Sequence, residues 1–144
     1  MCIRDRHKDS DRPRRDQIFV FGSNLAGRHG ASAAQYALRN CGAEYGNPIG
    51  LQGQSYAIPT KDKYIQTLPL DKIIPYIQAF KQFTLDQPHR EFFVTRVGCG
   101  LAGYSDEEIA PWFVGCGLNC VFPVEWQHYL FYDRLKALYS EYIS

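Results

Sequence analysis

The chain has 144 residues, of which 45% are hydrophobic and 15% aromatic, so it carries enough apolar mass for the core of one domain. Its formal net charge is only +1, and no segment approaches the roughly 20 apolar residues that a membrane-spanning helix needs. A nucleic-acid site requires a clustered basic surface, so we expect neither a membrane partner nor a sequence-specific nucleic-acid partner.

Residues 1–15 are expected to form a disordered leader, whether native or not, ahead of a single domain over residues 16–144. Residues 1–16 carry six Lys or Arg and four Asp, a net of +2, in a run without apolar periodicity. Met1–Arg6 has no apolar h-region, so a signal peptide is not predicted.

The five cysteines predict reduced thiols in a cytoplasmic protein. Their number is odd, no C-x-x-C pair occurs, and Cys116 and Cys120 lack a second pair of ligands, which argues against a structural zinc site. We therefore expect no metal and no cofactor, and thiols that pack as small apolar groups.

The first predicted strand, Gln17–Phe21, is apolar and ends at Gly22. A glycine-spaced loop follows and leads to an alanine-rich helix predicted over Ala31–Asn40, with a stop at Gly42. Asn47–Gln54 contains one proline and two glycines and is predicted to be a loop.

Strand and helix are predicted to alternate through the middle of the chain. Ser55–Pro59 is typical of a short buried strand, Thr60–Leu68 of a polar connection, and Leu70–Phe83 of a helix with one apolar face. A turn at Leu85–Arg90 then leads to the strand Glu91–Val97.

The last predicted elements begin with a capping box, Ser105 and Glu108, which opens a short helix through Phe113. Cys120–Phe122 is predicted to be a short strand, and Trp126–Ile143 an aromatic, amphipathic helix. Alternating strands and helices indicate the α/β class. In such sheets a ligand binds beyond the carboxyl ends of the strands.

Two glycine-rich loops, Gly22–Gly30 and Gly98–Gly103, leave predicted strands at those ends. Such loops expose backbone N–H groups, and the helix that follows adds the positive end of its dipole. The pair therefore predicts a phosphate or pyrophosphate site of nucleotide type, although the first loop matches neither a dinucleotide fingerprint nor a P-loop. Asn24 fits two roles: its carboxamide can pair with ribose hydroxyls, or it can form an Asx turn.

Both loops resemble ligand loops of the macrodomain family. Phe21–Ala34 is similar to the early macrodomain motif, in which an Asn precedes a Gly-rich loop and a small-residue helix, and Arg96–Tyr104 to the later loop that wraps the diphosphate. The likeness is closest to the branch of the terminal ADP-ribose protein glycohydrolases and covers about residues 17–123. It implies a three-layer α/β/α fold with a mixed, mostly parallel sheet. It also implies a cleft at the strand ends for ADP-ribose or a related NAD-derived nucleotide.

The resemblance assigns roles to individual residues. Asn24 would face the distal ribose, Gly98–Ala102 would donate backbone N–H groups to the diphosphate, and Tyr104 is one candidate contact for the adenine. Lys61 stands where that branch has its catalytic lysine, whereas Ala102 stands where it has an aspartate. The implied ligand-binding residues are Gly22, Ser23, Asn24, Gly27, Gly30, Gly98, Cys99, Gly100, Leu101, Ala102, Gly103 and Tyr104.

Three functions remain open from the sequence. The first is binding of ADP-ribose, free or attached to a macromolecule. The second is an ADP-ribosyl hydrolase that removes ADP-ribose from protein or nucleic acid through Lys61 or an ordered water. The third is an interaction domain with vestigial loops, in which side chains would fill the cleft.

Several reactive side chains have simpler structural interpretations, which we favour. His29 is expected at a surface turn, and Asp106 as a first-turn carboxylate on a helix dipole. Cys99 is expected to pack beneath its loop, although a cysteine near a helix N-terminus can have a lowered pKa. For Lys61 and Asp62 we favour solvated loop charges over a catalytic pair.

Overall fold

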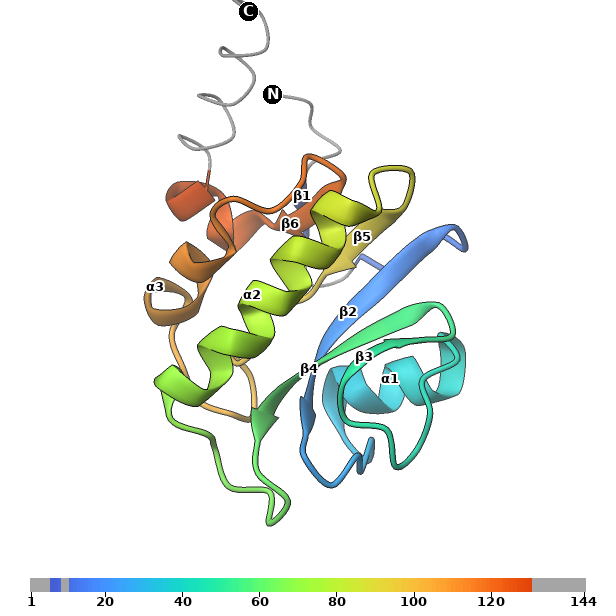
Figure 1. Cartoon of the computed structure of the whole chain (residues 1–144), viewed down its shortest axis with the longest axis vertical. Helices are drawn as coiled ribbons and strands as arrows, with labels where there is room; N and C mark the ends of the chain where they lie inside the picture. The colour runs from blue at the N-terminus through green and yellow to red at the C-terminus, as the bar shows by residue number, and fades with distance from the viewer. Residues whose placement is uncertain (1–5, 9–10, 131–144) are drawn as a thin grey trace, which may run out of the picture.

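The computed structural model describes residues 6–8 and 11–130, which contain a six-stranded sheet with the order β1-β6-β5-β2-β4-β3 (Figure 1). Neighbouring strands are parallel except β3 and β4. The predicted α/β class with a mixed, mostly parallel sheet is therefore confirmed. The strands are β1 (Arg6–His7), β2 (Gln17–Asn24), β3 (Gly50–Gln52), β4 (Ser55–Lys61), β5 (Glu91–Val94) and β6 (Cys120–Pro123).

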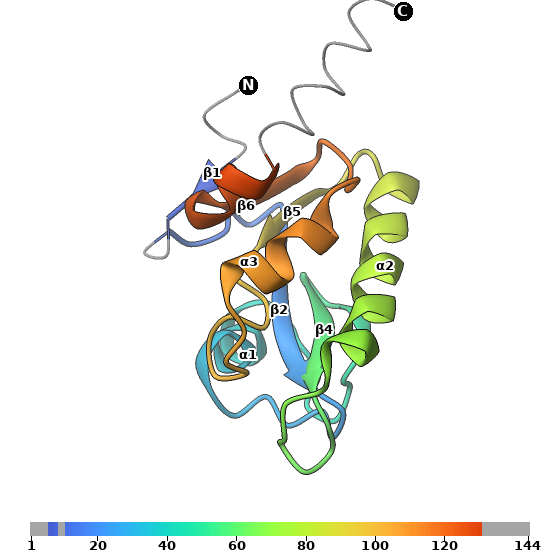
Figure 2. The ribbon, with the colours of Figure 1, turned by 90° about the vertical axis from the view of Figure 1, so that its left-hand side faces the viewer.

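Helices cover both faces of the sheet (Figure 2). α1 (Ser32–Asn40) packs on one face, where Ala34 and Ala37 contact the phenylalanines of β2. α2 (Leu70–Asp86), α3 (Asp106–Ile109) and the 3-10 helix Ala110–Phe113 pack on the other face. No helix within the described residues is long and apolar enough to cross a bilayer.

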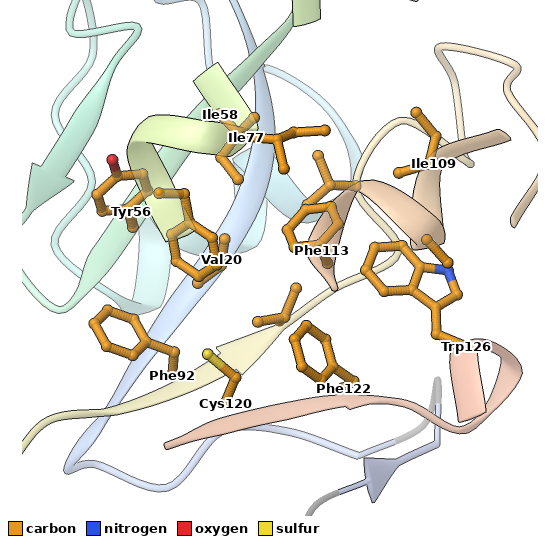
Figure 3. Close-up of a cluster of buried hydrophobic side chains, with 14 of the residues drawn as sticks. Val20, Tyr56, Ile58, Ile77, Phe92, Ile109, Phe113, Cys120, Phe122 and Trp126 are labelled. Atoms are coloured by element: carbon orange, nitrogen blue, oxygen red, sulfur yellow. The ribbon is translucent and has the colours of Figure 1, made fainter. Parts of the chain in front are cut away.

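The larger core lies between the sheet and α2 (Figure 3). Ile73, Ile77 and Phe80 of α2 are fully buried, as the predicted apolar face requires. They meet Phe92 of β5, and Trp126 closes the cluster beside α3. This aromatic core fixes α2 and α3 against the sheet and so positions the loops that lead into them.

Two short strands lie where the sequence predicted none. β3 lies inside the predicted loop Asn47–Gln54, and β1 lies inside the residues assigned to a leader outside the fold. Arg6 and His7 pair with the end of β6, so the expectation of a leader is wrong for these two residues. Neither strand exceeds three residues, so neither shows a two-residue apolar period.

Several other boundaries differ from those predicted. β2 and β4 run beyond their predicted ends, to Asn24 and Lys61. β5 ends at Val94, and the next residue, Thr95, is still bonded to β2 because its N–H and its Oγ1 both donate to the carbonyl of Val20. Of the predicted C-terminal helix, a 3-10 turn ends at Trp126 and α-helix follows through residue 130, and the remainder lies outside the described residues.

Candidate functional site

The two glycine loops meet beside the carboxyl ends of β2 and β5. One loop joins β2 to α1 and the other joins β5 to α3. They approach so closely that a Cβ built on Gly22 would lie 3.7 Å from the backbone nitrogen of Gly98. The capping box that ends the second loop is present as predicted, with Ser105 Oγ accepting the Glu108 N–H at 3.2 Å.

A cleft of about 800 Å³ opens between these loops. It is also bounded by the start of α1 and by Lys61 at the end of β4. Gly27, Gly103 and Tyr104 do not line it. The remaining predicted ligand residues all line it, namely Gly22, Ser23, Asn24, Gly30, Gly98, Cys99, Gly100, Leu101 and Ala102.

The second loop presents a run of unpaired backbone donors. The Cys99 N–H, one of the expected anion donors, donates to the Arg96 carbonyl at 3.0 Å and so closes a turn. Within the described part of the chain, the N–H groups of Gly100, Leu101 and Ala102 have no acceptor. Gly100 has open space where a Cβ would stand. Consecutive N–H groups of this kind form a site for an anion.

The start of α1 contributes a second set of donors. Its N-cap residue, Ala31, has no side chain that could accept a hydrogen bond from the first turn. The N–H groups of that turn therefore remain uncapped, and the positive end of the helix dipole adds to them. Gly30, Ala31 and Ser32 all line the cleft, so this end of α1 borders it.

The Asn24 side chain forms a turn, which is one of the two roles that the sequence allowed; the other was pairing with ribose hydroxyls. Its Nδ2 donates to the Arg28 carbonyl at 2.8 Å, and its Oδ1 accepts the Arg28 N–H at 3.0 Å. A carboxamide has two N–H donors and two acceptor lone pairs, so one of each remains. Asn24 lines the cleft, and the turn fixes the direction in which it presents them.

The other polar residues of the first loop hold the loop itself. Ser23 Oγ donates to the Pro48 carbonyl at 2.6 Å. Gly27 has φ +71°, and a Cβ there would lie 2.4 Å from the carbonyl carbon of Gly46. Gly27 thus allows two backbone segments to pack together, and it does not line the cleft.

Buried His29 belongs to the same loop, and its expected place at a surface turn is wrong. The residue is only 1% exposed, and its ring packs edge-on against Phe21. Nε2 lies 3.1 Å from the Asn47 carbonyl and 3.2 Å from Gln52 Oε1, which are both acceptors, so Nε2 carries the proton. His29 therefore fastens the first loop to the segment before β3 and does not line the cleft.

Four side chains with aromatic rings line a further part of the cleft, and the sequence did not predict them. His7 stacks on Phe93 with ring centroids 3.9 Å apart, and Phe19 lies beside Phe93 and Tyr36. All four line the cleft. Tyr104, the expected aromatic contact, instead donates its hydroxyl to the Leu68 carbonyl at 2.6 Å.

Lys61 lies at the end of β4, in register with Asn24 of β2. It lines the cleft, whereas the neighbouring Asp62 accepts the N–H groups of Tyr64 and Gln66 and so stabilises a turn. Among the described residues that line the cleft, Asp11 is the one acidic residue. Within the described part of the chain, therefore, no carboxylate that lines the cleft beside Lys61 replaces the aspartate that the macrodomain branch has at the position of Ala102.

Asp106 anchors the second loop from beneath. It accepts two hydrogen bonds from Arg96, at 3.0 and 2.7 Å, and one from Trp126 Nε1 at 2.8 Å. The Arg96 guanidinium holds the pKa of this carboxyl below its ordinary value, helped by Trp126. Asp106 therefore anchors the second loop, in addition to its expected interaction with the helix dipole.

Cys99 packs beneath the loop, as favoured from the sequence. Burial, reinforced by the negative charge of Asp106, raises the pKa of its thiol to about 12. The thiol is therefore protonated at neutral pH and is a poor nucleophile. The lowered pKa considered for a cysteine near a helix N-terminus is wrong here.

Comparisons with protein-family models, with curated proteins and with solved structures found no match. Four cationic side chains, Arg12, Arg28, Lys61 and Arg96, line the cleft, and among the described residues that line it Asp11 has the one carboxylate. Among the described residues, no group of three or more His, Cys, Asp or Glu side chains is placed to hold a metal ion.

Proposed function

We propose that this protein is a macrodomain-like α/β/α module that binds ADP-ribose or a related NAD-derived nucleotide. One observation carries the proposal: the features of the cleft follow one another along β2. Phe19 marks the aromatic end, Gly22 touches the second loop, and Asn24 lies beside Lys61. At about 3.3 Å per residue, Phe19 and Asn24 lie about 17 Å apart.

This order matches the order of groups in the ligand. The adenine would lie against His7, Phe93 and Tyr36, because a flat heterocycle stacks on aromatic rings. The diphosphate would accept the unpaired N–H groups of Gly100–Ala102 and those at the start of α1. The distal ribose would reach the donor and acceptor that remain on Asn24.

The charge of the cleft supports the same proposal. Asp106 offsets Arg96, and Arg28 and Lys61 add two further positive charges to the lining of the cleft. A dianionic linker would therefore meet a surplus of positive charge. A cleft filled with side chains would favour an interaction domain with vestigial loops, and the open volume of about 800 Å³ gives that alternative no such support.

Titration calorimetry with ADP-ribose tests the proposal, together with Gly100→Ala and Gly100→Val. A Cβ at Gly100 meets no protein atom within 4 Å, so both variants should keep the melting temperature of the wild type. In the cleft the added carbons would stand between the phosphate and its donors. We expect affinity to fall about tenfold for Ala and further for Val, since each lost charge-assisted hydrogen bond is worth about 1.5–3 kcal/mol.

Two outcomes would contradict binding of this kind. One is the absence of heat with wild-type protein at millimolar ADP-ribose. The other is wild-type affinity in Gly100→Val, which would mean that the anion does not approach this loop.

A second candidate function, ADP-ribosyl hydrolysis, is favoured by the position of Lys61. Its side chain lines the cleft at the strand end where Asn24 would hold the distal ribose. The amine could attack the anomeric carbon and displace the attached group, after which water would release ADP-ribose and restore the amine.

Turnover of an ADP-ribosylated protein should then disappear in Lys61→Ala while ADP-ribose still binds. The matched control is Lys63→Ala, since Lys63 is exposed in the same turn and does not line the cleft. Equal turnover in the wild type and in Lys61→Ala would show that this lysine is not the nucleophile.

A further inference from the structure

Two exposed apolar side chains line the cleft, and none of the contacts proposed for ADP-ribose uses them. Ile65 is 38% exposed and Leu101 is 66% exposed, and both line the cleft. Single exposed apolar residues are common on protein surfaces. Here two of them come from different loops to one opening.

The backbone of Ile65 is held in a conformation that its side chain disfavours. Its φ is +65°, in the left-handed region that β-branched residues rarely adopt. The turn around it is closed by the Ile65 N–H, which donates to the Asp62 carbonyl at 3.1 Å, and by the bonds of the Asp62 carboxylate. Such strain persists where the surroundings enforce it, and it is found at functional sites more often than elsewhere.

The loops that carry these two side chains are tied together at the Lys61 end of the cleft. Thr67 Oγ1 donates to the Ala102 carbonyl at 2.9 Å, next to Leu101. Lys61 forms a bridge with Thr67 and pairs in register with Asn24. Ile65 and Leu101 are therefore joined to the part of the cleft that the distal ribose would occupy, not to the aromatic end.

We propose that Ile65 and Leu101 bind an uncharged planar ring carried on the distal ribose, so that the ligand is an ADP-ribosyl conjugate of the NAD type. This inference rests on the proposed function, because Asn24 must hold the distal ribose. A ring contacts apolar side chains with loss of water from both surfaces. The ammonium of Lys61 at the same end disfavours a cationic ring and leaves a neutral one as the better fit.

Calorimetry with ADP-ribose, NADH and NAD⁺ tests this, since the three differ in the group on the distal ribose. NADH carries a neutral ring and should bind about tenfold more tightly than ADP-ribose, the gain expected from one ring-sized apolar contact. NAD⁺ carries a cationic ring and should bind more weakly than NADH. In Lys61→Met the difference between NADH and NAD⁺ should shrink.

Ile65→Gly separates the role in binding from a role in folding. Glycine accepts a positive φ, so the variant should melt at a higher temperature than the wild type. It should also reduce the affinity ratio of NADH to ADP-ribose to about one. Tyr64→Ser is the matched control, because Tyr64 is 72% exposed in the same turn and does not line the cleft. That variant should keep the ratio.

Each outcome decides one question. If ADP-ribose binds and NADH binds no more tightly, the ring site is overturned while the proposed function stands. If the preference for NADH survives in Ile65→Gly, the ring lies elsewhere and the inference is again overturned. If neither compound binds at millimolar concentration, the proposed function itself fails.

Discussion

The position of Asp106 was predictable from the sequence, but its contacts were not. The capping box placed it correctly in the first turn of α3. Its partners could not be read from the sequence, because Arg96 lies across the loop and Trp126 is 20 residues further along the chain. Asp106 also explains why the Cys99 thiol is a poor nucleophile. Burial and the negative charge of Asp106 raise the pKa of this thiol, and this effect exceeds any lowering by the dipole of the four-residue helix α3.

Replacing Asp106 by Asn should make stability less dependent on acid. The pKa of Asp106 is lowered by Arg96, so its contribution is present above the ordinary carboxyl pKa and is lost as the pH falls through the lowered value. Asn keeps an acceptor for Trp126 but loses the ion pair. We expect a loss of about 1–2 kcal/mol at pH 7 and less below pH 4.

Urea unfolding of the wild type and of Asp106→Asn at pH 7 and pH 3 measures both effects. The two proteins should converge at the lower pH. A difference in stability that is the same at both values would contradict the assigned role, because it would not depend on the ionisation of Asp106.

At the scale of the elements, the strands and helices with a strong apolar pattern were predictable, and the short or irregular ones were not. α2 follows its apolar face, and β2, β4 and β5 begin where predicted. The two glycine loops were also found, because glycine spacing after a strand is a local signal. What the spacing cannot tell is which glycine faces a ligand and which permits packing.

Gly27 and Gly30 form a matched pair for that distinction. Gly27→Ala combines a positive φ with a Cβ position 2.4 Å from Gly46, so the backbone of one segment must move. We expect a loss of roughly 2–4 kcal/mol, with the melting temperature lowered accordingly.

Gly30→Ala should leave stability within about 0.5 kcal/mol of the wild type, because its Cβ would stand in open space at the cleft. Thermal unfolding of both variants tests the contrast. If both substitutions were equally tolerated, the close contact between the first loop and the Gly46 turn would not be present in solution.

At the scale of the whole molecule, the order of strands in the sheet determines which residues line the aromatic end of the cleft. β1 pairs with β6, so the start of the described chain lies beside its last strand. This pairing carries His7 onto Phe93, at the aromatic end of the cleft. No local pattern predicts a contact between residues so far apart in sequence, which is why the sequence assigned residues 1–15 to a leader and chose Tyr104 as the aromatic contact.

His7→Ala and His7→Phe test whether this end of the cleft holds a base. His7 is 6% exposed, stacks on Phe93 and bonds through Nε2 to the Val94 carbonyl. Alanine removes the stacking and the hydrogen bonds of the ring and should cost about 1–3 kcal/mol of stability, whereas phenylalanine keeps a ring on Phe93 and loses only the hydrogen bonds of the imidazole to Val94 and Lys8.

Affinity for ADP-ribose should separate the same two variants by calorimetry. If the adenine stacks here, His7→Ala should bind about tenfold more weakly than the wild type, and His7→Phe should stay within about threefold, because stacking needs a ring and not an imidazole. Equal affinities in the two variants would place the base elsewhere. The aromatic group would then be a structural seam between β1 and β5, and the order of groups along β2 would no longer identify the ligand.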